Sequence, residues 1–400
     1  MSRAETADLS GRRVLVTGGT GFIGGRVVEK LVLEHGANPR VLTRSYANAP
    51  RIARFPVELV RGDVTEMADV RRAAAGCDVI VHCAYGSSGS REERHEVNVG
   101  GTANVLRAGA EAGVDRIVHM STVEVYDPPD EGVLTEASPR EKRGDPYGDS
   151  KLEAERLALE HAERGAPVTV VQPTVVYGPW APVWTADVLR RMREGPVALV
   201  DGGEGLCNAV YVDDVADAVL AASTIDDAVG EAFLVSSDEP VTWAEYYGRF
   251  EEMLGGTRTV SVPAEVALDR WEPPRRRGLL GEALEILGER SARERLFSTP
   301  EAKFARKVAR VLLPRKVREP LRRRVVAGAA GNGGPASGGG SDAPPDVSPD
   351  MVEFYRRKVD VRIDKARRVL GYEPAYSFER GMELTEQWAR WANLLGDQAA

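Results

Sequence analysis

Short apolar runs alternate with longer amphipathic stretches along the first 175 residues. The runs are rich in Val, Ile and Leu without strict alternation, which is typical of parallel strands buried on both faces. The amphipathic stretches between them predict helices, so the pattern favours an α/β fold with a doubly wound parallel sheet. The predicted strands are Arg13–Thr17, Pro39–Thr43, Val57–Arg61, Val79–His82, Arg116–Ser121, Val168–Gln172 and Ala232–Ser236. The predicted helices are Phe22–His35, Val70–Ala75, Glu92–Ala112 and Pro146–Arg164.

A glycine-rich loop follows the first predicted strand and leads directly into the first predicted helix. Glycines at this place allow a tight turn and a close approach of the backbone to a ligand. The free N–H groups at the start of the helix then favour a pyrophosphate, so the loop predicts a dinucleotide site. The loop residues expected to bind the cofactor are Gly18, Thr20, Gly21, Phe22, Ile23 and Gly24.

The end of the second strand bears on the choice of nucleotide. A carboxylate there would bind the ribose 2′-hydroxyl of NAD, whereas an arginine accommodates the 2′-phosphate of NADP. The strand ends in Thr43-Arg44-Ser45, without a carboxylate. We therefore expect NADP to be preferred over NAD, with Arg44 as the phosphate ligand. The alternative is that Arg44 is only a solvated loop cation.

Tyr147 and Lys151 lie one turn apart at the start of the fourth predicted helix, where Asp145 is the expected N-cap and Pro146 the first helical residue. A phenol has an ordinary pKa of ~10, and an ammonium group within a few ångströms lowers it. The pair therefore predicts an acid/base for a carbonyl or alcohol oxygen during hydride transfer. Thr122 follows the strand that ends at Ser121 and is placed to hydrogen-bond the same oxygen. The alternative is that the hydroxyl groups of Ser121 and Thr122 only stabilise the turn.

These residues and several short motifs, all in the right order, make the chain resemble the extended short-chain dehydrogenase/reductase superfamily, the NAD-dependent epimerase/dehydratase family. The resemblance covers about residues 12–260 and 358–392. It implies an enzyme with a Rossmann fold and a smaller, mostly C-terminal substrate-binding lobe. The matching motifs are Thr17–Gly24, Gly62–Val64, Val81–Ala84, Asn98–Thr102, Ser121-Thr122, Tyr147–Lys151, Gln172-Pro173, Val176–Pro179, Val212–Ala216 and Lys365–Gly371.

The resemblance also implies roles for individual residues. Asp63 and Val64 would contact the adenine, and Lys151 would hold the nicotinamide ribose. Thr122 would bind the substrate oxygen, and Tyr147 would be the acid/base. The other cofactor contacts implied by the family are Cys83, Ala84, Tyr85 and Pro173.

Departures from the family pattern leave the reaction type open. Glu124 matches an acid of sugar-nucleotide dehydratases, but Val123 replaces the acid before it, so Glu124 is either a base or a solvated turn carboxylate. Gln172 stands where the family often has an arginine. Cys207-Asn208 stand where epimerases often carry an arginine for the substrate diphosphate, although three arginines lie in the same lobe. Those three are Arg190, Arg191 and Arg193.

We therefore expect an oxidoreductase that transfers hydride between the nicotinamide, with NADPH favoured, and a carbonyl or secondary alcohol. The substrate would be a small molecule, either a nucleotide-linked keto sugar or a hydrophobic ketone. The alternative is a nucleotide-sugar epimerase or dehydratase that recycles its cofactor. Trp180 and Trp184 either line the substrate pocket or only pack.

The domain boundaries follow from these motifs and from composition. We expect the cofactor domain at 12–175 and about 208–238, and the substrate-binding lobe at 176–207, 239–298 and 351–396. Residues 328–350 are rich in Gly, Pro and Ser, which predicts a flexible linker.

A basic amphipathic insertion is expected at 299–327. Between residues 301 and 326 it holds ten Lys or Arg residues against two Glu. Its simplest interpretation is a solvated helix; the alternative is a weak peripheral contact with anionic lipid.

Charge and cysteine content exclude other classes of protein. The net charge of −8 argues against a nucleic-acid partner, and five scattered histidines predict no metal site. Three cysteines without a CxxC pair fit a reducing compartment, so we expect a cytoplasmic protein. By analogy with the family we expect a homodimer.

Overall fold

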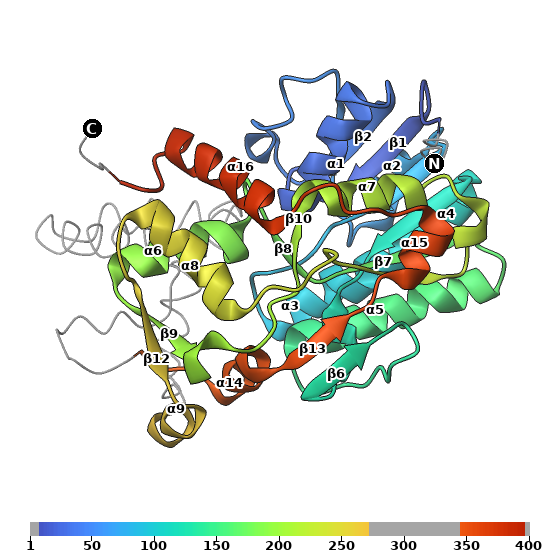
Figure 1. The fold of residues 1–400 in the computed structure, drawn as a ribbon. Coiled ribbons are helices and arrows are strands. Elements are labelled where there is room, and N and C mark those ends of the chain that lie inside the picture. Colours follow the sequence, from blue (N-terminus) through green and yellow to red (C-terminus); the bar gives the residue numbers. More distant parts are fainter. Residues whose placement is uncertain (1–7, 272–344, 397–400) are drawn as a thin grey trace, which may run out of the picture. The chain divides into compact units, whose positions relative to one another are not determined.

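The computed structural model describes residues 8–271 and 345–396, shown in colour in Figure 1. Its central element is a parallel sheet with the strand order β11-β7-β5-β4-β1-β2-β3. All seven strands predicted from the sequence are present, with ends that differ by at most one residue, which confirms the α/β prediction. The strands are β1 Arg13–Thr17, β2 Asn38–Thr43, β3 Glu58–Arg61, β4 Val79–His82, β5 Arg116–Met120, β7 Val168–Pro173 and β11 Ala232–Val235.

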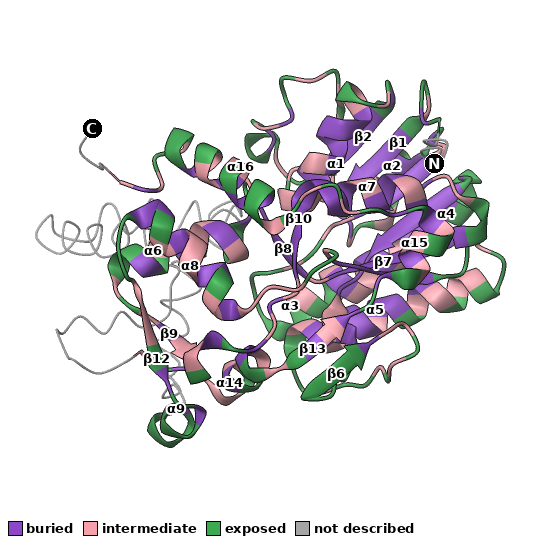
Figure 2. Ribbon diagram, viewed as in Figure 1, coloured by how far each residue is buried: buried purple, intermediate pink, exposed green. Residues whose placement is uncertain are grey.

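Helices cover both faces of this sheet because neighbouring strand residues point to opposite sides. On β1, Val14 and Val16 belong to the apolar cluster beneath α1 (Phe22–Leu33) and α7 (Val212–Ala222), and Leu15 belongs to the opposite cluster. Figure 2 shows β1, β2 and β7 as largely buried, whereas the edge strand β3 is half-buried or exposed. The opposite face is covered by α2 Met67–Ala74, α4 Gly101–Ala112 and α5 Pro146–Glu163.

The predicted helix Glu92–Ala112 has an internal irregularity. The structure divides it into α3 (Arg91–His95), a π-helical turn over Glu96–Gly100 and then α4. The wider turn coincides with the Gly100-Gly101 pair, where helix propensity is weakest.

A second group of elements lies beside the carboxyl ends of the main strands (Figure 1). It contains three two-stranded parallel pairs that the sequence analysis did not predict. The pairs are β8 Val175–Tyr177 with β10 Ala209–Tyr211, β9 Val197–Val200 with β12 Thr259–Val262, and β6 Glu131–Leu134 with β13 Lys358–Val361. The helices are α6 Asp187–Glu194, α8 Trp243–Leu254, α9 Ala264–Arg270, α14 Pro349–Arg356 and α16 Phe378–Trp391.

The C-terminal segment is shared between these two groups of elements. Helix α14 contacts α9 and β9, whereas α15 (Asp364–Leu370) packs on β11 and α7 of the main sheet layer. Ala375 donates its N–H to Asp214 Oδ1 at 2.7 Å and so ties the following loop to α7.

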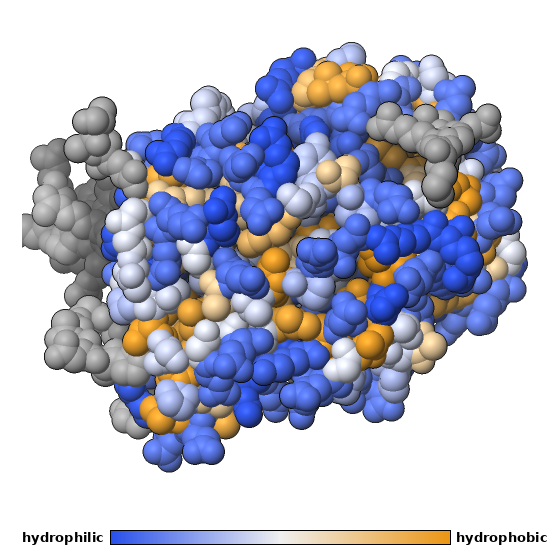
Figure 3. Space-filling model, viewed as in Figure 1, coloured by the Kyte–Doolittle hydropathy of each residue, from blue (hydrophilic) through white to orange (hydrophobic). Residues whose placement is uncertain are grey.

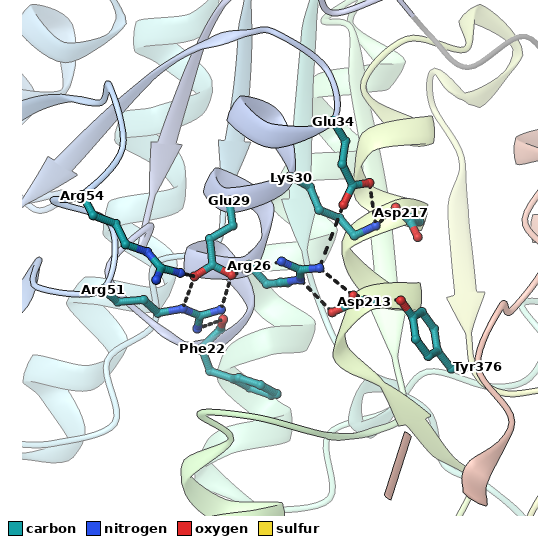
Figure 4. Close-up of polar contacts among 10 residues, drawn as sticks. All are labelled: Phe22, Arg26, Glu29, Lys30, Glu34, Arg51, Arg54, Asp213, Asp217 and Tyr376. Carbon is teal, nitrogen blue, oxygen red and sulfur yellow. Dashed lines mark hydrogen bonds and ion pairs between the residues drawn. The ribbon is translucent and has the colours of Figure 1, made fainter. Parts of the chain in front are cut away.

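Paired charges fix α1 against α7 and the loop after β2 (Figure 4). Arg26 donates to both carboxylate oxygens of Asp213, at 2.7 and 2.6 Å, and Arg51 donates to both oxygens of Glu29, at 2.9 and 3.0 Å. Although burial opposes ionisation, the hydrogen bonds from Arg51 and Arg26 hold the pKa of Glu29 below its usual value. We call this set the α1–α7 cluster: Arg26, Glu29, Lys30, Glu34, Arg51, Asp213 and Asp217.

The predicted basic insertion at 299–327 and most of the predicted linker lie outside the described residues. The end of the predicted linker is described: residues 345–348 have no regular structure, and α14 begins at Pro349. No helix in the described ranges is long and apolar enough to cross a membrane. The face in Figure 3 is mostly hydrophilic, with smaller hydrophobic areas.

Candidate active site

One cavity of about 1160 Å³ lies at the carboxyl ends of β1, β2, β4, β5 and β7. This edge is where parallel α/β sheets bind ligands. Every site residue predicted from the sequence contributes to its wall. They are Gly18, Thr20, Gly21, Phe22, Ile23, Gly24, Arg44, Asp63, Val64, Cys83, Ala84, Tyr85, Thr122, Glu124, Tyr147, Lys151 and Pro173.

The glycine loop folds tightly at the amino end of α1. Gly18 has φ +69°, and a Cβ there would lie 2.6 Å from the carbonyl group of Cys83. Gly21 donates its N–H to Gly18 O at 2.9 Å, and a Cβ on Gly24 would lie 2.5 Å from that same oxygen. Side chains at Gly18 and Gly24 would therefore open the turn and push α1 away from β4.

The amino end of α1 is suited to a phosphate group. Among the described residues no side chain caps it, which is also the case for α2, α4, α6 and α7. The N–H groups of its first turn thus face the cavity without the usual side-chain acceptor. Together with the close-packed glycines, this fits a dinucleotide pyrophosphate.

The structure leaves one cation free at the end of β2. Arg44 is exposed in the cavity wall, and within the described residues no hydrogen bond or ion pair engages its side chain. The flanking hydroxyls are used locally: Thr43 Oγ1 donates to Ser45 O at 3.0 Å, and Ser45 Oγ accepts from Ala47 N at 3.3 Å. Arg44 is therefore the group at this position that remains available to an added phosphate.

Tyr147 and Lys151 meet at the start of α5. Asp145 accepts the N–H of Gly148 at 2.5 Å and Pro146 is the first helical residue, as the sequence predicted. Tyr147 is hydrogen-bonded to Thr122, and its ring packs edge-on against Tyr85 with centroids 5.2 Å apart. The arrangement places two hydroxyl groups side by side in the cavity wall.

The electrostatics of this pair differ from the expectation. Burial raises the pKa of Tyr147, and the hydrogen bond with Thr122 offsets only part of this. Burial lowers the pKa of Lys151 to about 8, and its Nζ donates to Met120 O at 2.5 Å. The expected lowering of the Tyr147 pKa by Lys151 is therefore wrong for this structure, because desolvation dominates and the ammonium group is held elsewhere. Tyr147 carries its proton at neutral pH.

Glu124 is not a solvated turn carboxylate, because its side chain is held by an ion pair. Arg143 Nη2 donates to Glu124 Oε2 at 2.8 Å and to Glu124 O at 3.2 Å. Both side chains are about three quarters buried, with 27% of Glu124 and 21% of Arg143 exposed. Glu124 is thus an ion-paired carboxylate in the cavity wall, and Arg143 is a wall residue that the sequence analysis missed.

Of the residues considered for a substrate diphosphate, Cys207 and Asn208 border a small recess next to the cavity rather than the cavity itself. The side-chain amide of Asn208 is hydrogen-bonded to the backbone of β13. It donates to Val359 O at 2.8 Å and accepts from Val361 N at 3.3 Å. Within the described chain, the α6 arginines Arg190, Arg191 and Arg193 are absent from the cavity wall. A different cation, Arg357, lines the cavity beside Phe354.

Gln172 belongs to a buried polar network beneath the site. Its Nε2 donates to both oxygens of Glu155, at 3.0 and 2.9 Å, and its Oε1 accepts from the Tyr126 hydroxyl at 2.9 Å. Arg140 lies 3.3 Å from Glu155 and supplies the positive charge. An arginine at residue 172 is therefore not needed to balance Glu155.

The two tryptophans of the lobe have different positions. Trp184 lines the cavity and stacks on Phe354, with ring centroids 5.9 Å apart. Trp180 packs instead against Trp388 and beneath the guanidinium group of Arg51. Trp184 and Phe354 thus form an apolar part of the cavity wall.

Comparisons with known proteins agree with this geometry. Residues 14–236 match the model of the NAD dependent epimerase/dehydratase family. The chain is 34% identical over 210 residues to a putative dihydroflavonol 4-reductase of Synechocystis, covering 50% of this chain and 60% of the relative. It is 30% identical over 246 residues to a 2-alkyl-3-oxoalkanoate reductase of Shewanella oneidensis, covering 58% and 63%. The chain thus spans about three fifths of the length of these two curated relatives.

Solved structures show the same fold. An epimerase of Methanothermobacter thermautotrophicus superposes with a TM-score of 0.66 at 21% identity, covering 96% of this chain and 95% of that one. A dTDP-glucose 4,6-dehydratase of Streptomyces venezuelae with bound NAD superposes with a TM-score of 0.64 at 23% identity, covering 95% and 98%.

Proposed function

The chain belongs to the NAD dependent epimerase/dehydratase family, and on that premise we propose that it is an NADPH-dependent reductase of a carbonyl compound. The observation that carries this proposal is that Tyr147 and Thr122 line the same cavity as the glycine loop at the amino end of α1. A protonated phenol is the acid that a carbonyl oxygen needs when the carbon receives hydride.

The nicotinamide, when bound, supplies the hydride. Tyr147 donates its proton to the carbonyl oxygen, and Thr122 hydrogen-bonds that oxygen and holds it in line with the phenol. Lys151 supplies a donor for the nicotinamide ribose. The amino end of α1 binds the pyrophosphate, and Arg44 binds the 2′-phosphate of NADP.

A hydrophobic ketone is the substrate class that we favour. Trp184, Phe354 and Met351 give the substrate side an apolar wall. The names of two relatives, a putative dihydroflavonol 4-reductase and a 2-alkyl-3-oxoalkanoate reductase, support reduction of this kind. In the Glu124–Arg143 pair the carboxylate is already held by a cation, which weakens it as a base for dehydration.

The alternative is a nucleotide-sugar epimerase, in which hydride returns to the same molecule. It is supported by 27% identity to a UDP-glucose 4-epimerase of Vibrio cholerae. A reductase consumes NADPH, whereas an epimerase returns the hydride and leaves the cofactor unchanged overall. Measuring net cofactor consumption therefore separates the two reactions.

The test follows nicotinamide absorbance while the protein is given NADPH with hydrophobic ketones, or the oxidised cofactor with nucleotide sugars. A reductase consumes one NADPH for each alcohol formed. Isomerised nucleotide sugar formed without a net change in the cofactor would contradict the reductase and support the alternative.

A further inference from the structure

Arg357 lies where the C-terminal segment returns to the active site. It stands between α14 and β13, and its carbonyl oxygen accepts the N–H of Leu206 at 2.8 Å. Its side chain lines both the main cavity and a smaller recess of about 60 Å³ behind it. The residues that border both spaces are Val123, Glu124, Arg143, Thr174, Val175, Phe354 and Arg357.

The charges around the recess do not balance. Arg143 is neutralised by Glu124 at 2.8 Å. Arg357 is only 18% exposed, yet its nearest carboxylate among the described residues is Glu353, at 3.9 Å and itself 71% exposed. The Nε of Arg357 is buried without a hydrogen-bond partner in the described part of the chain. A mostly buried guanidinium group with so weak a partner is costly to desolvate.

The preceding residue, Arg356, shows that an arginine in this segment can form a close ion pair when it lies at the surface. Arg356 is 56% exposed and pairs with Asp201 at 2.9 Å. Arg357 instead projects into a wall that includes the stacked rings of Trp184 and Phe354. A cation beside an apolar wall matches a ligand with an anionic end and an apolar body.

The size of the recess limits that anionic end. A water molecule needs about 10–15 Å³ of such space, so the recess of about 60 Å³ holds roughly four to six. The recess itself therefore accommodates a carboxylate, whereas a nucleoside would have to lie in the main cavity, which Arg357 also lines.

We propose that Arg357 binds a carboxylate of the substrate, and that the substrate is a keto acid whose apolar chain lies against Trp184 and Phe354. The assignment of a keto acid rests on the proposed reductase, whereas the carboxylate site depends only on Arg357 and its surroundings. Arg357 is then a specificity-determining residue that orients the ketone toward Tyr147.

The first experiment compares medium-chain keto acids with their methyl esters by NADPH oxidation. We expect the acid to have a kcat/KM about 10- to 100-fold above that of the ester, the range of one charge-assisted contact. Arg357→Met should remove this preference, mainly by raising KM for the acid, and leave the ester within about twofold. Arg357→Lys should keep part of the preference, and Arg356→Met, the matched control, should keep all of it.

The second experiment needs no turnover. Decanoate should raise the melting temperature of the NADP-bound wild type and of Arg356→Met, but not of Arg357→Met. If no ketone consumes NADPH while decanoate still binds through Arg357, the reductase fails and the carboxylate site stands. Equal decanoate binding by Arg357→Met, or equal loss of acid and ester activity, would overturn the site. Binding of UDP through Arg357 without binding of decanoate would also overturn it and favour a diphosphate.

Discussion

The α1–α7 cluster and the active-site cavity both bring charged groups into the protein interior, but they do so in opposite ways. In the cluster (Figure 4), each arginine, lysine and carboxylate has a partner of opposite charge at hydrogen-bond distance. In the cavity, Glu124 and Arg143 form a pair, but the mostly buried Arg357 lacks a partner at hydrogen-bond distance within the described residues. Among the same residues, the buried Lys151 donates only to a carbonyl oxygen, and Arg44 is unpaired but exposed.

This difference distinguishes charged groups that stabilise the fold from charged groups that are available to bind a ligand. Paired charges offset the cost of desolvation inside the protein itself. Unpaired charges leave that cost in place until a cofactor or substrate provides the counter-charge. Substitutions in the cluster should therefore lower stability, and substitutions in the cavity should lower activity or binding.

The largest effect is expected from Tyr147→Phe. It removes the proton donor, so kcat should fall about 10³-fold, within the usual range for general acid catalysis. The thermal midpoint and the dissociation constant for NADPH, measured by fluorescence titration, should stay near wild type. Activity that survived this change would place the acid elsewhere in the cavity.

Asp213→Asn tests whether the paired charges of the α1–α7 cluster stabilise the fold. It leaves the part-buried Arg26 with Glu29 as its close partner, at 3.2 Å. Because some compensation remains, we expect a loss of about 2–3 kcal/mol, below the ~3–5 kcal/mol for breaking a fully buried pair. Urea unfolding measures this, with Arg380→Met in the exposed Arg380–Glu383 pair as the control, where the loss should be near zero. Equal losses in both variants would contradict a stabilising role for the cluster.

Lys151→Met should stabilise the cofactor-free protein. Because burial lowers the pKa of Lys151 from 10.5 to about 8, the folded wild type bears a desolvation cost at pH 7. That shift corresponds to roughly 3 kcal/mol, of which about 1 kcal/mol is offset by the lost hydrogen bond to Met120. Below pH 8 the amine is charged in both states and the cost is fully present. From about pH 8 to 10.5 the unfolded state binds more protons, so the wild type gains stability and the advantage of the variant shrinks.

Unfolding both proteins at pH 7 and pH 10 measures this difference. A variant that was less stable than wild type at pH 7 would mean that Lys151 is as well compensated as the charges of the α1–α7 cluster.

The smallest of these effects concerns Arg44→Asp. The variant places a carboxylate where the 2′-phosphate of NADP would lie, so the ratio of kcat/KM for NADPH to that for NADH should fall about tenfold or more. Arg12→Asp, outside the cavity, is a suitable charge-matched control. An unchanged ratio would show that Arg44 does not bind the 2′-phosphate and is only a solvated loop cation.

Much of the fold was accessible from the sequence because its signals are local. The buried strands are short runs rich in Val, Ile and Leu, and the start of α5 is marked by Asp145-Pro146. The pairing of β6 with β13 has no such signal. Residues Glu131–Gly132 are exposed, and their partners follow more than 200 residues later.

In the candidate site, too, only the residues that belong to a local sequence motif could be predicted. The glycine loop, Thr122, Tyr147 and Lys151 are found by motif, and all of them line the cavity. Arg143 and Arg357 carry no motif, because their importance comes from what surrounds them in space. The raised pKa of Tyr147 likewise depends on burial, which the spacing of two residues along a helix does not reveal.

The parallel pairing of β6 with β13 has a consequence for how such a protein diversifies. It delivers a residue from the last sixth of the chain to a cavity whose acid and nucleotide loop are encoded in the first half. Recognition of the molecule to be transformed and the chemistry performed on it are therefore inherited on separate stretches of the gene. Substitutions in the C-terminal segment would therefore change which substrate is bound, while the residues of the N-terminal half that carry the chemistry stay the same.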